Sequence, residues 1–403
     1  MLETYKQVRE SARQLESYRA GNDEHRFYDE LETLLAGKQI DTKRISLRAI
    51  FEEFVPNGRE RVREMDPRYR GSQSNISMME ANDGVSTTAF SNIIGQITYA
   101  SVLDRLDAPE FIGQSLVTTV AAATQDVEII PGISVVGDVA EDIGEMQEYP
   151  VVGLSEEFVT APRKVKDGFI LPISEEAIFE DKTGLLMQRA DTATEGLGIT
   201  WEREILDTCL GQTTSYSRNG GSAQATYANT HTEGTFDNLS ASTALQDWTD
   251  VQSALLLFDG IDDPITGDPV MIGGPLQIVV PSALRGTLAR ILSATEIREV
   301  TNTNTTSISG NPLNSSIAGL VRGTQYEGYS GPFIKDRTSS DDTWFIGNFK
   351  KAFEYREIWP IQVFRADRNS DAGFTRDVVT AIKVRRKGAP AIRDPRYVVK
   401  ATA

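Results

Sequence analysis

One segment of the sequence carries negative charge with nothing to balance it. Between Leu106 and Pro162 there are eleven carboxylates and no Lys or Arg. Like charges repel, so such a run either lies on a solvated face or contacts a positively charged surface outside itself. Because complementary charge sets register and partner choice, the second interpretation predicts a mating surface between copies of the chain.

The opposite charge lies near the end of the sequence. From Arg376 onward there are eight basic and two acidic side chains, whereas the first 70 residues are neutral with 14 of each. The whole chain has 41 Lys and Arg against 58 Asp and Glu, a net charge of −17. This balance excludes a chain-wide basic footprint for nucleic acid or an anionic membrane.

The N-terminal quarter has the spacing of amphipathic helices. Apolar residues recur every three or four positions in three charge-rich segments, and once more further along. The predicted helices cover residues 2–18, 23–36, 41–54 and 89–106. The first three bury little apolar volume, so we expect them to form an arm that lies on another surface.

The middle of the chain changes from extended to helical patterning. Short apolar runs broken by Gly and Pro between Asp126 and Pro172 predict a long β-hairpin. Ser174 is placed to cap a helix start, and Asp181 begins a helical run that ends at Gly211. A helix of about 28 residues would span roughly 40 Å, more than a compact domain needs.

The rest of the chain mixes helices with strands, so the sequence predicts an α+β fold. Gly211–Ser242 and Thr301–Ser316 are rich in small polar residues and predict loops. The Asp residues of Asp259–Pro269 predict a solvated turn. Further expected elements are a helix over 244–258, a buried strand over 276–281, a helix capped by Ser282, strands over 343–349 and 353–358, and a long hairpin around 369–374.

Recognisable catalytic chemistry is missing from the sequence. There is no Gly-x-Ser-x-Gly elbow, and Gly196-x-Gly198 lies inside a helical pattern, where a dinucleotide loop cannot form. One Cys, Cys209, and two His, His25 and His231, cannot supply a disulfide or the usual zinc site. No segment has the apolar length of a signal peptide or membrane span. We predict a non-enzymatic cytosolic protein that needs no metal or other cofactor.

Three segments carry a resemblance to a known family. They are PRKVKDGFILPISEEAIFED at 162–181, TGDPVMIGGPLQIVVPSALRGTLARIL at 266–292, and the run from WFIGNFKKAFEYREIWP to RDPRYVV at 344–399. In order and spacing they resemble the major capsid protein of tailed bacteriophages, which has the Hong Kong ninety-seven type of fold. The likeness extends from about Phe90 to Val399, and the last segment is its most specific part.

The resemblance implies a subunit with two compact domains and two long extensions. These are an N-terminal arm over 1–125, an E-loop over 126–172, a P-domain over 173–243 and 356–391, and an A-domain over 244–355 and 392–403. Such subunits form the hexamers and pentamers of an icosahedral shell, which is the head of the virion and is assembled in the bacterial host cytoplasm. The shell encloses double-stranded DNA without binding it specifically, and an acidic wall fits this because it repels phosphate.

The resemblance also implies particular partners and contacts. Portal and scaffold proteins are expected partners, with a decoration protein as a further one, and no membrane is involved. We expect the acidic E-loop stretch to contact basic residues of adjacent subunits. The acidic candidates are Asp138, Glu141, Asp142, Glu145, Glu148, Glu156 and Glu157, and the basic candidates are Arg365, Arg385, Arg386 and Lys387.

Some relatives lock their shells with a Lys–Asn isopeptide bond. The residues of this chain that match those positions are Lys164, Lys166 and Asn369. The acid that follows in the hairpin is Asp377, where the relatives use Glu, so the sequence favours a shell without the bond.

Two other functions fit part of the sequence. A bacterial nanocompartment shell would share the fold but enclose an enzyme, and such shells tend to lack so long an N-terminal arm. A soluble enzyme would need a set of acid, base or nucleophile residues, which we do not find. DNA inside the particle would indicate a phage shell, and protein inside it would indicate a nanocompartment. A monodisperse monomer that forms no particles would favour the soluble enzyme.

Overall fold

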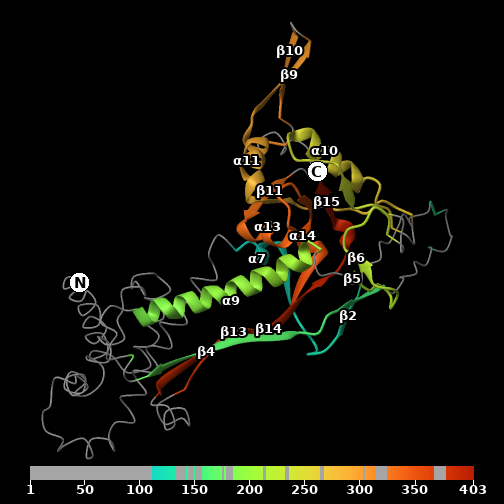
Figure 1. Cartoon of the computed structure of the whole chain (residues 1–403). Helices are drawn as coiled ribbons and strands as arrows, with labels where there is room; N and C mark the ends of the chain where they lie inside the picture. Colours follow the sequence, from blue (N-terminus) through green and yellow to red (C-terminus); the bar gives the residue numbers. More distant parts are fainter. Residues whose placement is uncertain are drawn as a thin grey trace, which may run out of the picture. The chain divides into compact units, whose positions relative to one another are not determined.

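The computed structural model describes a little over half of the chain (Figure 1). The described residues are 111–131, 142–143, 149, 157–174, 177, 185–211, 215–231, 236–263, 267–302, 305–311, 313–314, 325–366 and 378–403. The helices predicted within residues 1–106 lie outside them, as do residues 132–141 and most of 144–156 in the predicted long hairpin.

The chain divides into two compact units, which we describe separately. The first contains Lys166–Ile199 and Trp359–Arg386 together with Met1–Ala108. The second contains Pro109–Val165, Thr200–Ile358 and Lys387–Ala403. One long helix and three strands have residues in both units.

The long helix predicted from the sequence is α9, Leu185–Cys209. Its 25 residues give a length of about 37 Å at 1.5 Å per residue. Gly211 follows with a φ of +70°, a left-handed conformation that Gly adopts without strain and that ends helices. In the second unit the final turns of α9 bury Ile205, Leu206 and Cys209, so the prediction of this helix is confirmed.

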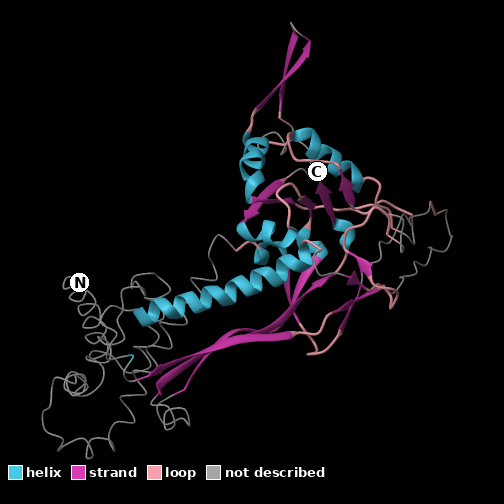
Figure 2. Cartoon of the chain, in the orientation of Figure 1, coloured by secondary structure: helices cyan, strands magenta, loops and turns pink. Residues whose placement is uncertain are grey.

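The second unit is built on a five-stranded mixed sheet (Figure 2). One of its interior strands, Leu276–Pro281, is buried at every residue, as its apolar sequence predicts. The two neighbours of this strand run in opposite senses, one parallel and one antiparallel to it. The strand order is β11 (Tyr326–Gly331), β8 (Leu276–Pro281), β12 (Trp344–Gly347), β15 (Val398–Thr402) and β7 (Leu239–Ala241).

Both faces of this sheet are covered, because successive residues of a strand point to opposite sides. On β12, Trp344 and Ile346 pack with the helices of one face, and Phe345 packs on the other. The first face holds α10 (Trp248–Phe258), the 3₁₀ turn η3 (Ser282–Leu284) and α11 (Arg285–Ser293). The second holds α7 (Gly113–Leu116), the end of α9, α13 (Pro332–Thr338) and α14 (Phe349–Ala352).

A second sheet contains three long strands and one short strand. Its order is β1 (Thr118–Ala121), β13 (Phe353–Ala366), β14 (Val378–Ile392) and β4 (Val165–Ser174). The two strands predicted over 343–349 and 353–358 are therefore β12 and the start of β13, and the long C-terminal hairpin consists of β13 and β14. The mixed α+β class predicted from the sequence is confirmed.

The remaining strands form three small pairs. Antiparallel β2 and β3 are the described base of the long hairpin that the sequence predicts. The pairs are β2 (Glu128–Pro131) with β3 (Phe158–Ala161), β5 (Ser215–Tyr216) with β6 (Gln224–Ala225), and β9 (Glu296–Asn302) with β10 (Thr305–Gly310). A last 3₁₀ turn, η4 (Pro395–Tyr397), leads into β15.

Four local predictions are wrong. Gly211–Ser242, predicted as a loop, contains β5, β6 and β7. Thr301–Ser316 is not simply a loop, because β9 and β10 pair across its first half. Ser282 does not cap its helix; its hydroxyl donates to the Gly331 carbonyl at 3.3 Å and a 3₁₀ turn precedes α11. Asp263, expected in a solvated turn, is 1% exposed and binds Arg396.

Candidate intersubunit surfaces

The base of the long hairpin in the second unit is held by a buried ion-pair group. The Lys164 Nζ lies 2.8 Å from Glu128 Oε2 and donates to the Asp126 carbonyl at 3.1 Å. Arg356 Nη1 lies 3.6 Å from the other oxygen of Glu128. The hydrogen bond from Lys164 lowers the pKa of Glu128, and Arg356 adds to this effect. These contacts fix where β2 and β3 leave the compact part of the unit.

The acidic candidates differ in how the structure places them. Asp142 is exposed, whereas Glu157 is buried and forms a short ion pair with Arg218 of the same chain. The side chain of Glu157 is therefore engaged within the subunit. The other candidates lie outside the described residues: Asp138, Glu141, Glu145, Glu148 and Glu156.

All four basic candidates lie on β13 or β14. In the first unit the side chain of Arg386 is 2% exposed and its Nη2 lies 2.8 Å from Asp167. In the second unit the Lys387 Nζ donates to Gln125 Oε1 at 2.6 Å. Arg365 belongs to β13, and its side chain lies outside the described residues.

Arg385 has a different environment within the first unit. Its guanidinium carbon lies 4.4 Å from the ring centre of Trp359 and 4.3 Å from that of Phe364. Its Nε and Nη2 donate to the neutral amide oxygen of Gln362 at 3.2 and 3.0 Å. The charge of Arg385 is thus held by aromatic faces and an amide, and among the described residues no carboxylate contacts it.

Two lysines extend this arrangement. The Lys166 Nζ lies 5.9 Å from the centre of the Trp359 ring, and the Lys383 Nζ lies 5.7 Å from that of Phe364. We call Lys166, Trp359, Arg385, Phe364 and Lys383 the cation–aromatic row. Trp359 and Phe364 are not among the candidates predicted from the sequence, although both occur in the run WPIQVF, where bulky rings flank Gln362.

The residues considered for a covalent crosslink have separate environments. The side chain of Lys164 is 0% exposed and paired with Glu128. Lys166 is exposed and belongs to the cation–aromatic row. Asn369 lies outside the described residues.

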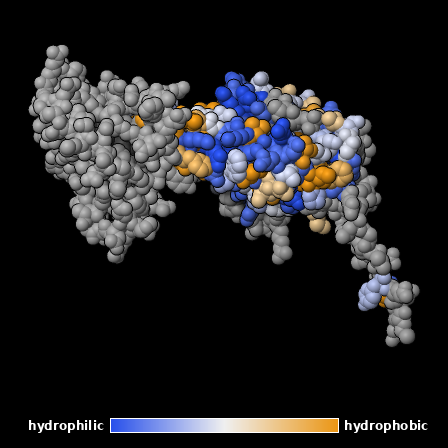
Figure 3. Space-filling view, turned by 90° about the horizontal axis from the view of Figure 1, so that it is seen from below, coloured by the Kyte–Doolittle hydropathy of each residue, from blue (hydrophilic) through white to orange (hydrophobic). Residues whose placement is uncertain are grey.

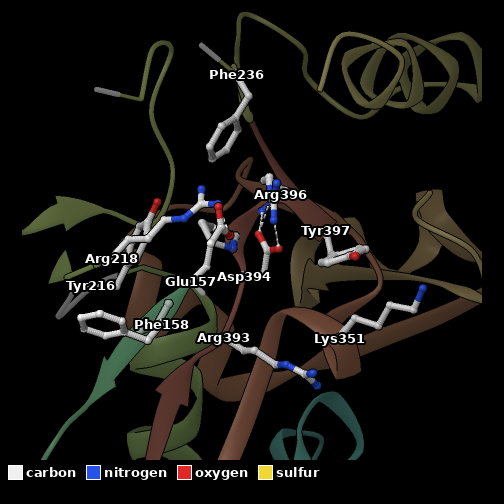
Figure 4. Close-up of a pocket in the computed structure, with 12 residues that line it drawn as sticks. Glu157, Phe158, Tyr216, Arg218, Phe236, Lys351, Arg393, Asp394, Arg396 and Tyr397 are labelled. Atoms are coloured by element: carbon white, nitrogen blue, oxygen red, sulfur yellow. Dashed lines mark hydrogen bonds and ion pairs between the residues drawn. The ribbon is translucent and has the colours of Figure 1, made fainter. Parts of the chain in front are cut away.

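The second unit also contains a pocket of about 370 Å³ (Figure 4). Glu157 and Asp394 are the carboxylates of its lining, and each is paired with Arg, namely Arg218 and Arg396. Figure 4 shows these two pairs next to each other. Because both carboxylates hold ion pairs, neither is placed to act as a general base.

Arg396 connects three parts of the second unit. Its Nη1 lies 2.8 Å from Asp263 in the turn after α10, and its Nη2 lies 2.8 Å from Asp394. The guanidinium and the Asp263 carboxylate are almost fully buried. A buried ion group of this kind fixes the approach of the chain to β15.

Cys209 and the described acidic residues show no catalytic or metal-binding arrangement. Burial raises the pKa of the Cys209 thiol well above its ordinary value, which keeps it protonated and unreactive. Among the described residues, no group of three or more His, Cys, Asp and Glu side chains is arranged to hold a metal ion. None of the described helices has the length and apolarity that a membrane span requires.

A family model gives the identity of this architecture. The model described as phage capsid protein matches residues 157–401, which is more than half of the chain. The chain belongs to this family. The match contains the end of the hairpin base, α9, both sheets apart from β1, and the cation–aromatic row. Membership of this family confirms the prediction that the chain is a capsid protein. Such a protein is a structural component of the virion and assembles with further copies of itself.

Three solved structures with similarity to this capsid protein come from viruses and a virus-like particle. The capsid of cyanophage Pam1 is 12% identical, with 68% of this chain and 84% of that one covered and a TM-score of 0.42. A structure from Gordonia phage Cozz is 16% identical, with 73% of this chain and 86% of that one covered and a TM-score of 0.41. A virus-like particle from Pyrococcus furiosus is 10% identical, with 75% of this chain and 97% of that one covered and a TM-score of 0.42. No curated protein matches the sequence.

Proposed function

We propose that this capsid protein is the major head subunit of a tailed phage, with the Hong Kong ninety-seven type of fold. Copies of it form hexamers and pentamers that close an icosahedral shell around double-stranded DNA. The N-arm, E-loop, P-domain and A-domain keep the residue ranges expected from the sequence. Family membership, the long helix α9 and the long paired strands β13 and β14 support this proposal.

The observation that carries self-assembly is the exposure of large apolar side chains along extended strands. Ile129 on β2 is 64% exposed and Val127 beside it is 55% exposed, and Ile170 on β4 is 64% exposed. Figure 3 shows hydrophobic residues among hydrophilic ones on one face of the described part. Strands that expose such residues gain stability when another surface covers them. In a shell, adjacent subunits provide that surface.

The cation–aromatic row is the surface that we assign to the acidic stretch of a neighbouring subunit. Lys166, Lys383 and Arg385 contact rings and an amide, so among the described residues their charges have no carboxylate partner. The acidic stretch has no Lys or Arg of its own. A stretch rich in carboxylates and a surface rich in basic side chains can complement each other between two subunits.

Two of the residues expected at this contact have partners within the subunit, so we revise the proposed set. Arg386 and Glu157 are engaged inside the subunit, by Asp167 and Arg218. We therefore assign the intersubunit role to Arg385, Lys166 and Lys383, with the acidic residues from Asp138 to Glu156 as their partners. Arg365 and Lys387 remain further candidates.

Charge reversal tests this contact. Lys383→Glu should weaken assembly at low salt, because it places a carboxylate among the neighbour's carboxylates, and added salt should reduce the difference from wild type. Lys350→Glu, at an exposed lysine on α14, is the matched control and should assemble normally. The fraction of protein in particles, measured by sedimentation across salt concentrations, reports both. Equal assembly of Lys383→Glu and the control at every salt concentration would contradict the contact.

Particle contents test the rest of the proposal. Shells isolated from infected or lysogenic cells should contain double-stranded DNA, and portal, scaffold or decoration proteins should copurify with the particles or their precursors. A protein cargo without DNA would identify a nanocompartment shell instead. The net charge of −17 supports the DNA assignment, since an acidic wall does not trap the genome.

A further inference from the structure

The β9–β10 hairpin of the second unit takes no part in the contacts proposed above. Its two strands form a sheet of their own, paired from Glu296 with Gly310 to Asn302 with Thr305. Figure 1 shows the hairpin extending beyond α11. Ile308 on β10 is 61% exposed. An isolated two-stranded hairpin is marginally stable in water, so a segment of this kind needs further pairing or packing.

The hairpin sequence favours pairing along its edges. Seven of the 15 residues from Glu296 to Gly310 are β-branched, which favours extended backbone. Monomeric proteins protect exposed strand edges with Lys, Pro or inward charges. This segment has no Lys and no Pro, and its charged residues end at Glu299. The edges of β9 and β10 are therefore suited to accept another strand.

We propose that β10 of one subunit pairs with β9 of the next around the axis of a hexamer or pentamer. This inference rests on the proposed shell function. The outer edges of a hairpin belong to two different strands, so each copy offers one edge and accepts the other. Such a head-to-tail contact closes into a ring when the copies are related by rotation. The product is an antiparallel barrel with two strands from each subunit, and closure removes every free edge.

The sequence of the hairpin favours a second copy of this chain as its partner. From Val300 to Val321 there is no charged residue, so electrostatic attraction to DNA or to an acidic or basic protein is weak there. Backbone hydrogen bonds between strands do not depend on charge. When β10 of one copy pairs with β9 of the next, neighbouring strands around the ring run in opposite directions, so the antiparallel pairing within each hairpin continues between copies.

Thiol crosslinking between two single-cysteine variants tests the ring. Cys209 is the only natural Cys and is buried, so it does not react with a crosslinker. Glu296→Cys and Ser309→Cys place thiols at two exposed positions at the same end of β9 and β10. Each variant is purified, the two are mixed and assembled, and a short bismaleimide is added. Since each chain carries one accessible thiol, a covalent dimer reports contact between copies.

The expected result is a dimer band from the mixture of Glu296→Cys and Ser309→Cys particles. A mixture of Ser253→Cys, on the exposed face of α10, with Ser309→Cys is the control and should give no such band. Dimers from Ser309→Cys alone would show β10 paired with β10 and would overturn the ring, as would particles without any crosslink. Electron microscopy of the same samples separates these outcomes from failure of the shell proposal, in which no particles form.

A charge placed on the hairpin provides a second test. Ile308→Lys introduces the residue that natural edge strands use against pairing, and we expect loss of hexamers and pentamers. Leu256→Lys on α10 is the matched control, because Leu256 is 60% exposed and Ile308 is 61% exposed. Normal assembly of Ile308→Lys, with normal morphology, would overturn the inference.

Discussion

The buried carboxylate of Glu202 on α9 accepts hydrogen bonds from the backbone N–H of Gly113 at the start of α7. The N–H lies 3.0 Å from Oε1 and 2.9 Å from Oε2. The Ile112 N–H also donates to Oε1, at 3.0 Å. A side chain distant in sequence thus satisfies two donors that α7 leaves free. This contact fixes the segment that leads into β1 against the long helix.

Gly113 is tightly enclosed by this contact, which gives a first prediction. A Cβ at this position would lie 2.7 Å from Glu202 Oε2 and 3.2 Å from the Ile205 Cβ. We expect Gly113→Ala to lower the free energy of unfolding by about 1–3 kcal/mol, the usual cost of overpacking. Denaturant unfolding of the unassembled subunit measures it.

Gly196 provides the matched control for this substitution. It lies within α9, and a Cβ there meets nothing within 4 Å. Ala is the better helix former, so Gly196→Ala should raise the free energy of unfolding by about 0.5–1 kcal/mol. If both substitutions have the same effect, the close contact at Gly113 does not determine stability.

The pH dependence of stability tests the burial of Glu202. Burial raises its pKa, while the N–H donors of Gly113 and Ile112 lower it less strongly. Because the folded pKa exceeds the unfolded one, this group stabilises the fold fully below the unfolded pKa, and the contribution is lost as pH rises through the folded pKa. Glu202→Gln should remove this decrease of the free energy of unfolding with rising pH. Glu195→Gln, at an exposed position, should leave the decrease unchanged. Identical pH profiles of unfolding for wild type and Glu202→Gln would contradict this account.

The ion pair between Asp263 and Arg396 gives a third prediction. Removing one partner of a buried pair typically costs about 3–5 kcal/mol. In the Asp263→Asn variant, Arg396 still has Asp394 as an ion-pair partner. We therefore expect the substitution to lower the free energy of unfolding by about 3 kcal/mol, the lower end of that range. Exposed Asp262→Asn is the neighbouring control and should change the free energy of unfolding by less than about 0.5 kcal/mol. A small effect of Asp263→Asn would show that the pair does not fix the approach to β15.

Lys164 at the hairpin base gives a fourth prediction. Its hydrogen bond lowers the pKa of Glu128. A carboxylate whose pKa is lowered on folding stabilises the folded state. For Glu128 this stabilisation is fully present above the pKa of Glu in the unfolded chain, and it is lost as pH falls through the lowered pKa of the folded state. Lys164→Met should therefore weaken the fold at neutral pH and reduce its sensitivity to acid. Arg163→Met, at a side chain that is 81% exposed, is the control and should keep the acid sensitivity of wild type.

Local patterns in the sequence were sufficient to predict the most regular elements. The apolar run at 276–281 predicted β8, and the apolar spacing that ends at Gly211 predicted α9, because each pattern reflects burial of that element alone. β10 and the end of β9 were predicted as a loop because their Thr and Asn residues are typical of turns. Their pairing depends on backbone hydrogen bonds that leave no apolar alternation in the sequence.

The contacts of charged residues were harder to predict than the elements that carry them. Arg386 and Asp167 are 219 positions apart, and Arg396 and Asp263 are 133 positions apart. Charge counts cannot show which carboxylate is folded against which guanidinium. The sequence therefore indicated a basic C-terminal region, but it could not separate Arg386, which is paired inside the subunit, from Arg385, which is held by rings.

Electron microscopy of the full-length chain, purified and assembled from low to high salt, tests the central claim most directly. The account predicts closed shells built from rings of five and six subunits, with fewer shells when salt screens the contacts of the cation–aromatic row. A monodisperse monomer at every salt concentration, with no rings or shells in the images, would contradict it.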